Sequence, residues 1–433
     1  MARTHVIAGI DVGSSKISTL IAQHDEEEDK IRIVGIASVE SKGVRKGQIV
    51  DIEEAAESVV DSVERAERMA GYSLDRAFVT IGGGHIESRN SHGVVAVADP
   101  SGEITTSDVE RVIEAARAIS LAESRDILHV LPREYKVDGE TQVKDPQGMS
   151  AVRLEAETHL ITGSSTAIRN IQKCVSEVGV DSDGLVFSGL ASSLAVLSDT
   201  EKELGVVLVD IGGGTTSIAV YVEGAITYSS VLPIGGRNVT NDIAAGLRVS
   251  LEGAEKIKIA LGEGAKKKKK HRKEGLGVED KKSDELNLSS LGTEDLDRKV
   301  SKKTLVDGII RPRLNEIFTM VGMELTNAEV GGKTPSGVVV TGGGANCIGV
   351  LDAAKRMLSL PARIGLPKGV TGLIDEVNNP VFAASVGLVL YGTEVEEGQG
   401  SWLGSSNIMS KFDKIPVGGI IGRAGEVFKK LLP

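Results

Sequence analysis

Three apolar stretches of the chain each run directly into a glycine-rich turn. They are HVIAGIDVGSSK (His5 to Lys16), LGVVLVDIGGGTTS (Leu204 to Ser217) and SGVVVTGGGAN (Ser336 to Asn346). Short runs of valine, isoleucine and leucine that are bounded by glycine predict buried β-strands. A second apolar run, ISTLIA or IAVYV, follows each of the first two turns. Both of these turns are therefore predicted to close a β-hairpin.

An aspartate lies at the end of the first strand in both hairpins. Asp11 and Asp210 are each followed within two residues by glycine and then by hydroxyl side chains, and they lie nearly half the chain apart. A separation this long does not suit a short repeat. It predicts an α/β protein that is built from two homologous halves.

The stretch 84–163, between the halves, predicts several strands and one helix. The helix covers TSDVERVIEAARAI, where Ser107 is the expected N-cap and Glu110 completes a capping box. A different stretch, 263–303, begins with a lysine-rich run and contains few large apolar residues. That composition predicts a mobile loop.

The last part of the sequence predicts a linker followed by an amphipathic helix. Residues 393–415 have few core signals, whereas residues 416–433 place apolar side chains along one helical face and cations on the other. Such a helix suits the surface of an anionic membrane, and packing on the protein's own core is the alternative. The apolar positions are Ile420, Ile421, Ala424, Val427, Phe428, Leu431 and Leu432, and the basic positions are Arg423, Lys429 and Lys430.

Composition narrows the class of protein. A chain of 433 residues is long enough for two to four domains with large cores. The 61 acidic and 50 basic residues give a net charge of −11, and with only 6 Phe, 5 Tyr and 1 Trp they argue against nucleic-acid binding. Two cysteines, no membrane-length apolar run and no secretory signal predict a cytoplasmic protein. The 52 glycines are a larger fraction of the residues than in an average protein, and several of them lie in the turns that follow the apolar strands.

The glycine-rich turns have the chemistry of a phosphate cradle. Glycine lets the backbone approach an anion, and hydroxyls and one cation add donors. Asp11 and Asp210 suit Mg²⁺ held through its waters. For a single hairpin, a simple connection between strands is the better interpretation, but two matching hairpins favour phosphate binding. The candidate phosphate-binding residues are Gly13, Ser14, Ser15 and Lys16 in the first turn and Gly212, Gly213, Gly214, Thr215 and Thr216 in the second.

Taken together, these motifs resemble the actin-like ATPase superfamily. There is no GxxxxGK[ST] motif, and no helix follows the glycine turns as in a dinucleotide fold. The segments LPIGGRNVTNDI and GAEKIKIALG resemble the superfamily's GGxx(V/F)xxxI segment and its nucleoside-contacting helix. The resemblance implies an actin-like, two-lobed α/β fold of duplicated ribonuclease-H-like domains that binds ATP with Mg²⁺. The residues implied to border the nucleoside are Gly236, Glu255, Lys258, Gly342, Gly343, Gly344 and Asn346.

Within the superfamily, the sequence is similar to the FtsA family of bacterial cell-division proteins. The runs ILHVLPREYKVDGE, DPQGMSAVRLEAETHLIT and VFSGLASSLAVLSDTEKELGVVLVDIGGGTTSIAVY carry this resemblance. It implies an FtsA-type inserted α+β subdomain at 84–163. The expected lower lobe comprises 1–83, 164–200 and 371–392, the upper lobe comprises 201–240 and 331–370, and 241–330 forms an insertion in the upper lobe.

The resemblance also implies a set of partners. An FtsA-type protein polymerises into filaments, binds the C-terminal peptide of the tubulin-like protein FtsZ, and contacts other division proteins through the inserted subdomain. Its amphipathic helix would bind anionic lipids on the cytoplasmic face of the cell inner membrane, at the division site. The expected function is therefore a membrane tether for FtsZ filaments during septum formation.

One departure from the superfamily bears on the chemistry. Several of its ATPases carry Glu or Gln, which orders the attacking water, where this chain has Ser188 and Gly189. A serine hydroxyl is a poor base near neutral pH, so any ATPase activity is expected to be slow. Two alternatives remain at this point: a pilus-assembly protein resembling PilM, and a small-molecule kinase with the same fold.

Overall fold

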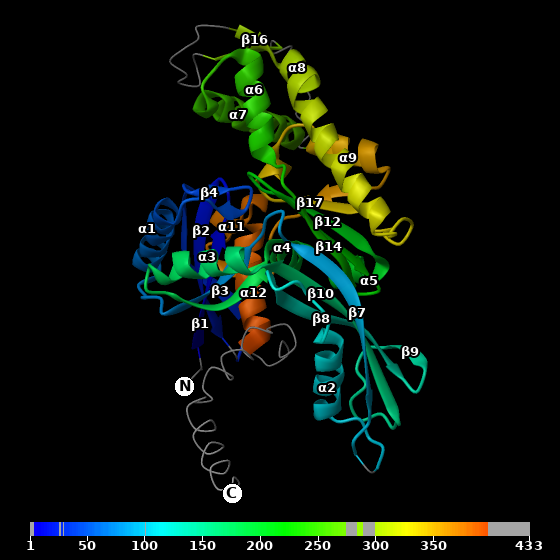
Figure 1. Ribbon diagram of the computed structural model, residues 1–433. Coiled ribbons are helices and arrows are strands. Elements are labelled where there is room, and N and C mark those ends of the chain that lie inside the picture. The colour runs from blue at the N-terminus through cyan, green and yellow to red at the C-terminus, as the bar shows by residue number, and fades with distance from the viewer. Residues whose placement is uncertain are drawn as a thin grey trace, which may run out of the picture.

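The structure is a computed structural model that describes residues 4–396, except 26, 29, 100, 274–283 and 289–298. It contains two large mixed β-sheets, one in a lower lobe and one in an upper lobe, with a smaller subdomain beside them (Figure 1). The predicted tail segments 397–415 and 416–433 lie outside the described residues.

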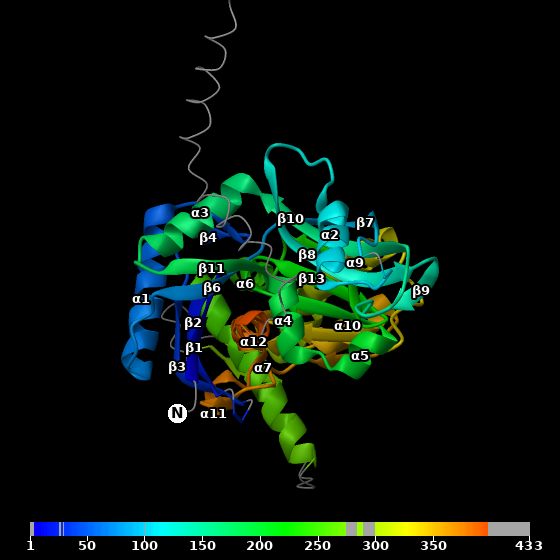
Figure 2. The ribbon, with the colours of Figure 1, turned by 90° about the horizontal axis from the view of Figure 1, so that it is seen from below.

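The lower lobe is a six-stranded sheet with helices on both faces. Its strand order is β11-β6-β1-β2-β3-β19, in which β1 runs antiparallel to β2 and parallel to β6. Helices α1 and α3 cover one face, and α4 and α12 pack on the other (Figure 2). The elements are β1 Thr4–Val12, β2 Lys16–Asp25, β3 Lys30–Glu40, β6 Arg76–Ile81, β11 Asp181–Phe187, β19 Thr371–Gly372, α1 Ile52–Ala70, α3 Ser165–Ser176, α4 Ser188–Val196 and α12 Ala383–Glu396, with a small ribbon of β4 Val44–Arg45 and β5 Gln48–Ile49.

The upper lobe repeats this design. Its five-stranded sheet has the order β14-β13-β12-β17-β18. Strand β13 pairs antiparallel with β14 and with β12, whereas β17 pairs parallel with β12 and with β18. The lower sheet shows the same pattern along β3, β2, β1, β6 and β11. The predicted duplication is therefore confirmed. The strands are β12 Val206–Ile211, β13 Thr216–Val222, β14 Ala225–Leu232, β17 Val338–Thr341 and β18 Ala362–Ile364.

Helices α4 and α12 lie between the two sheets, so one core serves both lobes. Alternate residues of a strand point to opposite faces. Val206 and Leu208 of β12 join the core around α4 and α12, whereas Val207 and Val209 join a second core formed with the upper helices. The other helical elements of the upper lobe are α5 Asp199–Leu204, α6 Gly236–Leu247, α7 Leu251–Lys273, α8 Lys302–Leu305, η2 Val306–Ile310, α9 Arg311–Asn327, η3 Gly343–Asn346 and α10 Val350–Leu358, followed by α11 Ile374–Val377 and η4 Pro380–Phe382.

The inserted subdomain emerges between β6 and α3. It is a four-stranded antiparallel sheet of order β7-β10-β8-β9 with α2 packed against it, and it has a small core of its own. Its elements are β7 Glu87–Ala96, α2 Thr106–Arg117, β8 Arg125–Val137, β9 Glu140–Val143 and β10 Arg153–Ser164. This α+β architecture agrees with the expectation from the sequence.

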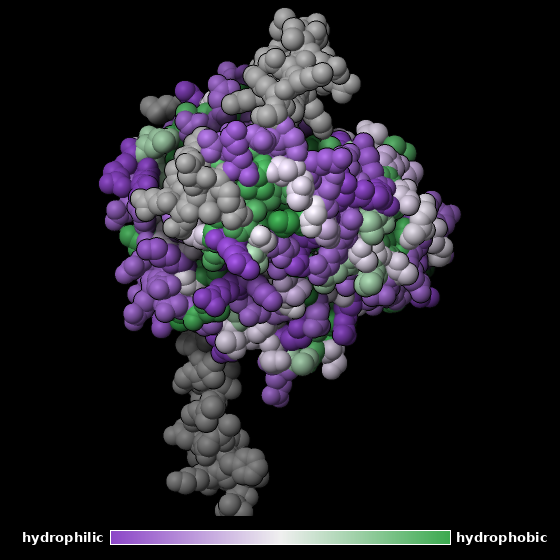
Figure 3. All heavy atoms as spheres, turned by 90° about the horizontal axis from the view of Figure 1, so that it is seen from above, coloured by the Kyte–Doolittle hydropathy of each residue, from purple (hydrophilic) through white to green (hydrophobic). Residues whose placement is uncertain are grey.

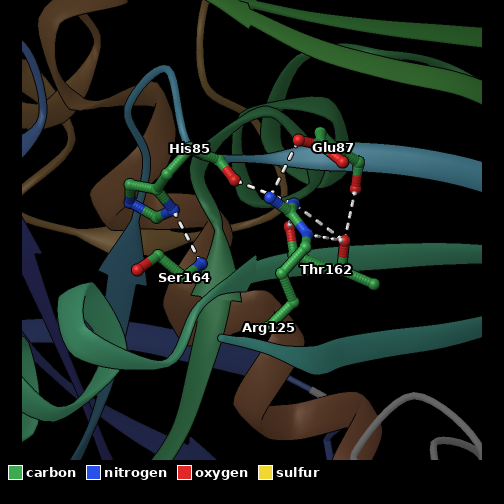
Figure 4. Close-up of polar contacts among 5 residues, drawn as sticks. All are labelled: His85, Glu87, Arg125, Thr162 and Ser164. Atoms are coloured by element: carbon green, nitrogen blue, oxygen red, sulfur yellow. Dashed lines mark hydrogen bonds and ion pairs between the residues drawn. The ribbon is translucent and has the colours of Figure 1, made fainter. Parts of the chain in front are cut away.

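Arg125 joins the three strands where the subdomain meets the lower lobe (Figure 4). Its guanidinium donates to Glu87 Oε1 at 2.8 Å, to Thr162 Oγ1 at 2.9 Å and to the His85 carbonyl at 2.9 Å. His85 Nδ1 in turn accepts from the Ser164 backbone N–H at 3.3 Å. The segments that enter and leave the subdomain are thus tied to each other.

Several sequence-based boundaries were wrong. The N-cap of α2 is Thr105, which forms a capping box with Asp108, instead of Ser107 with Glu110. The expected loop 263–303 is helical in its first part, because α7 continues through Lys273 on a run of lysines, which favour helix. The short strands β15 (Glu285–Asn287) and β16 (Lys299–Ser301) pair within it. Helix α12 likewise continues to Glu396, into the expected linker 393–415.

The surface seen from above is mainly hydrophilic, with hydrophobic residues gathered toward the middle of that face (Figure 3). Among the described residues, no helix combines the length and apolar character that crossing a bilayer would require. On α7, Leu251 and Ile259 are exposed although they are large and apolar. Both also line the cavity between the lobes.

Candidate functional site

A cavity of about 850 Å³ lies between the two lobes. Ligand pockets for small molecules commonly have volumes of about 300 to 1,000 Å³. All three glycine-rich turns that the sequence singled out contribute to its walls, together with α7 and the segment 379–384. The predicted site residues that line it are Asp11, Gly13, Ser14, Ser15, Lys16, Asp210, Gly212, Gly213, Thr215, Gly236, Glu255, Lys258, Gly342, Gly343, Gly344 and Asn346.

The first two turns have the same backbone closure. The Gly13 N–H donates to the Lys16 carbonyl at 3.1 Å, and the Gly212 N–H donates to the Thr215 carbonyl at 2.8 Å. The turns face each other so closely that a methyl group on Gly213 would lie 2.0 Å from Ser15 Oγ. Glycine is required at Gly213 because the opposite turn occupies the space of a side chain.

The two predicted Mg²⁺-binding aspartates have different hydrogen-bond donors. Asp11 Oδ1 accepts from Thr80 Oγ1 at 2.9 Å, and Asp210 Oδ2 accepts from Ser192 Oγ at 2.5 Å. Burial raises the pKa of Asp210 to about 6; the hydrogen bond from Ser192 opposes this shift, the negative charge of Asp11 adds to it, and Lys16 also opposes it. Two carboxylates in a cavity that also holds phosphate donors fit a hydrated Mg²⁺ ion.

The pKa of Asp210 predicts a pH dependence of folding stability. Because the pKa of Asp210 is higher in the folded chain than the ordinary pKa of an aspartate carboxyl, about 3.9, the folded state binds the proton more tightly. Stability from this group should therefore increase as the pH falls from about 6 to 4, by about 3 kcal/mol in total, and be absent above that window. Melting curves of the wild type and Asp210→Asn between pH 4 and 7.5 test this. Parallel stability profiles for the two proteins would contradict it.

Lys16 is half-buried beside both aspartates. Its Nζ donates to Ser18 Oγ at 2.8 Å and lies 4.3 Å from the ring centre of Phe382. Burial lowers the pKa of the Lys16 ammonium, while Asp11 and Asp210 raise it. The cation therefore lies among groups of opposite charge within the cavity, where it can also meet an anionic ligand.

The third turn packs directly against the second hairpin. Gly342 has φ +78°, and a methyl group on it would lie 2.1 Å from Asp210 Oδ1. Its N–H donates to the Pro380 carbonyl at 3.1 Å. Asn346 Nδ2 donates to Asn379 Oδ1 at 2.9 Å. Residues just before α12 thus complete this wall.

Glu255 and Lys258 form one polar cluster on α7. Lys258 Nζ donates to Glu255 Oε2 at 2.7 Å and to Thr240 Oγ1 at 2.9 Å, and it lies 3.3 Å from the Gly236 carbonyl oxygen. Thr240 Oγ1 also donates to Glu255 Oε2 at 2.6 Å. The cluster presents a carboxylate and an ammonium to the cavity, a combination suited to ligand hydroxyls.

Two predicted phosphate-binding residues do not line the cavity. The Thr216 side chain is fully buried and donates to the Ile234 carbonyl at 2.8 Å. Gly214 packs against Ser14, since a methyl group there would lie 2.8 Å from its Oγ. Thr216 is the first residue of β13, next to the turn, and its position in the strand turns its side chain away from the cavity. The basic and apolar tail residues 420–432 lie outside the described residues.

Other residues of the site were not found from the sequence. Thr80 and Asn379 line the cavity. Ser192 does not line it, but its hydroxyl donates to the Asp210 carboxylate. Thr80 could have been suggested by its position at the end of an apolar strand. Ser192 carries no such signal, because its role depends on how α4 crosses from one sheet to the other.

Comparison with known families assigns most of the chain. Residues 83–162 match the model described as the SHS2 domain inserted in FtsA, and residues 207–387 match the model of cell division protein FtsA. Cell division protein FtsA of Pseudomonas aeruginosa is 38% identical, over 95% of both chains. That of Borreliella burgdorferi is 40% identical, over 91% of this chain and 92% of its own.

Solved structures show the same fold at low sequence identity. A PilM-PilN type IV pilus biogenesis complex contains a chain with a TM-score of 0.61 and 15% identity, covering 90% of this chain and 98% of that one. MreB5 of Spiroplasma citri, solved with AMPPNP bound, has a TM-score of 0.52 and 13% identity, covering 92% and 98%. The predicted actin-like fold is therefore confirmed. The sequence identities, together with both family models, establish that the chain belongs to the FtsA family of cell division proteins.

Proposed function

We propose that this chain binds Mg·ATP between its lobes, polymerises, and tethers FtsZ filaments to the cytoplasmic membrane while it recruits other division proteins. The observation that carries the proposal is the pair of matching hairpin turns that face each other across one cavity. The bound nucleotide in MreB5, which shares the fold, supports the choice of ligand.

The donors of the cavity match the parts of a nucleotide. The turns at Gly13 and Gly212, with Ser15 and Lys16, would bind the phosphates through N–H, hydroxyl and ammonium donors. Asp11 and Asp210 would hold the waters of Mg²⁺, and phosphate oxygens would complete the coordination of the ion. The described part of the chain contains no cluster of three metal-ligating side chains. The pair Glu255 and Lys258 would bind the ribose hydroxyls.

Binding of the nucleotide, more than its turnover, would serve assembly. Ser188 lines the cavity, and its hydroxyl is paired with Ser217 Oγ at 2.9 Å. A serine hydroxyl is a weak general base, so this residue would orient a water without removing its proton. A steady-state rate well above about one turnover per second under saturating Mg·ATP would contradict this part of the proposal.

The membrane contact would come from the tail. In the sequence of residues 416–433, apolar residues recur at helical spacing, and Arg423, Lys429 and Lys430 fall between them. This pattern suits an anionic bilayer surface. The inserted subdomain has its own core, and hydrogen bonds of Arg125 join its strands where it meets the lower lobe. It would offer a separate surface to other division proteins.

Liposome co-sedimentation tests the tether. The intact chain and a chain that ends at Ser401 are each mixed with anionic vesicles, with and without FtsZ, in the presence of Mg·ATP. Only the intact chain is expected to pellet and to bring FtsZ with it. A full-length Ile421→Ser/Phe428→Ser variant keeps the charges and the length, and it should remain in the supernatant. Equal pelleting of all three proteins, or failure to recruit FtsZ, would reject the proposal.

A further inference from the structure

The two halves of the fold treat their aspartates differently. In the lower sheet, β6 lies beside β1, and Thr80 of β6 donates to Asp11 at 2.9 Å. In the upper sheet, β17 lies beside β12 in the same way, and Thr341 is the register partner of Asp210. Thr341 Oγ1 instead donates to the Gly365 carbonyl at 3.1 Å. The upper aspartate therefore receives no hydroxyl from the equivalent position of its own sheet.

Helix α4 supplies the missing hydroxyl. Ser192 Oγ donates to Asp210 Oδ2 at 2.5 Å, and neither side chain is more than 9% exposed. One turn earlier on the same helical face, Ser188 Oγ pairs with Ser217 Oγ at 2.9 Å. Asp210 and Ser217 are register partners across the upper hairpin. Since α4 directly follows β11 of the lower sheet, the lower lobe holds the upper hairpin at two adjacent points.

We propose that Ser192 is a positioning residue that orients the Asp210 carboxylate for the water shell of Mg²⁺. The proposal rests on the nucleotide-binding function proposed above. Ser192 is not among the residues that line the cavity, whereas Asp210 is. With Oδ2 held by Ser192, Oδ1 is directed toward the Gly342 turn, where a methyl group would lie 2.1 Å from it. The orientation of the upper carboxylate thus depends on a helix that belongs to the lower lobe.

The neighbouring serine provides a matched control. Ser193 is as fully buried as Ser192 and is also on α4. Its hydroxyl donates to the Leu190 carbonyl at 2.7 Å and is paired with the Tyr221 hydroxyl at 2.5 Å. Loss of either hydroxyl removes buried hydrogen bonds from the same helix, so both alanine variants should lose thermal stability. Only Ser192 contacts the aspartate.

The test measures how strongly Mg²⁺ tightens ATP binding. The dissociation constant for ATP is determined by calorimetry in excess Mg²⁺ and in EDTA, for the wild type, Ser192→Ala, Ser193→Ala and Ser192→Thr. The ratio of the dissociation constant in EDTA to that in excess Mg²⁺ should be about tenfold smaller in Ser192→Ala than in the wild type. The reason is that Ser192→Ala loses a charge-assisted hydrogen bond that orients the carboxylate. Ser193→Ala should keep the wild-type ratio, and Ser192→Thr, which retains the hydroxyl, should restore it.

The outcomes separate the two proposals. A wild-type chain that binds no ATP would overturn both the nucleotide-binding function and the role of Ser192. A wild type that binds ATP with a clear Mg²⁺ effect, together with an unchanged ratio in Ser192→Ala, would overturn the positioning role alone. So would an equal fall in Ser193→Ala. If Ser192→Ala does not fold, Ser192→Cys replaces it, because cysteine is similar in size to serine but is a weak hydrogen-bond donor. Ser192→Cys must then show the reduced ratio, and Ser192→Thr must keep the wild-type ratio.

Discussion

A Gly342→Ala substitution is expected to abolish ATP binding and to lower the free energy of unfolding by roughly 3 kcal/mol or more. Gly342 has φ +78°, a backbone conformation that disfavours any side chain. The added methyl group would also lie 2.1 Å from Asp210 Oδ1 and 2.6 Å from the Ile211 carbonyl oxygen. Relief of these overlaps requires the third turn to move away from the second hairpin. Thermal melting and ATP titration measure the two effects.

The adjacent glycine supplies the control for stability. A methyl group on Gly343 would meet no atom within 4 Å, and its φ lies outside the left-handed region. Gly343→Ala should therefore leave the melting temperature close to that of the wild type. If Gly342→Ala also melts normally and binds ATP, the close contact between this turn and Asp210 has no importance for the site.

A Gly387→Ala substitution should unfold the chain or reduce its stability by several kcal/mol. Gly387 lies on α12 where it crosses α4, and a methyl group there would lie 1.8 Å from the Ala191 carbonyl oxygen and 2.3 Å from its carbon. Both obstructing atoms are backbone, so no rotamer change can relieve the overlap. Because α4 and α12 lie between the two sheets, a shift of either helix disturbs both lobes.

Gly264→Ala on α7 tests whether this effect is specific. Gly264 is exposed, and a methyl group there would meet nothing within 4 Å. Alanine favours helix over glycine by about 1 kcal/mol, so this variant should be as stable as the wild type or slightly more stable. Chemical denaturation monitored by circular dichroism compares the two variants. A loss of stability in Gly387→Ala no larger than in Gly264→Ala would show that the helices can separate at little cost.

The fold and the walls of the site were largely readable from the sequence. Apolar runs that end in Asp11 and Asp210 predicted both hairpins, because strand, turn and charge follow one another locally. The polar partners behind the aspartates were not readable. Ser192 contacts Asp210 only because α4 crosses between sheets, and Asn379 contacts Asn346 only because the chain returns to the cleft near its last described helix. Such pairings depend on the tertiary arrangement, which no local pattern records.

The N-cap of α2 was predicted at Ser107 but lies at Thr105, for a different reason. Thr105 and Ser107 both precede acidic residues at the spacing of a capping box, so the pattern allowed two starts for the helix. Thr105 was selected because Asp108 is also bound by the Ala98 backbone N–H at 3.1 Å and by Arg111. The choice between equivalent local signals was made by neighbouring strands and side chains.

The site of the insertion has a consequence for how this family can diversify. Strands β6 and β11 are parallel neighbours, and α3 connects them as an ordinary crossover helix. The whole subdomain leaves and rejoins the chain between β6 and α3, where His85 and Ser164 are hydrogen-bonded. Its two ends therefore begin and finish at one point of the lower lobe. During evolution, such a module can be remodelled for new partners, or exchanged, while the strands that carry the cleft keep their register.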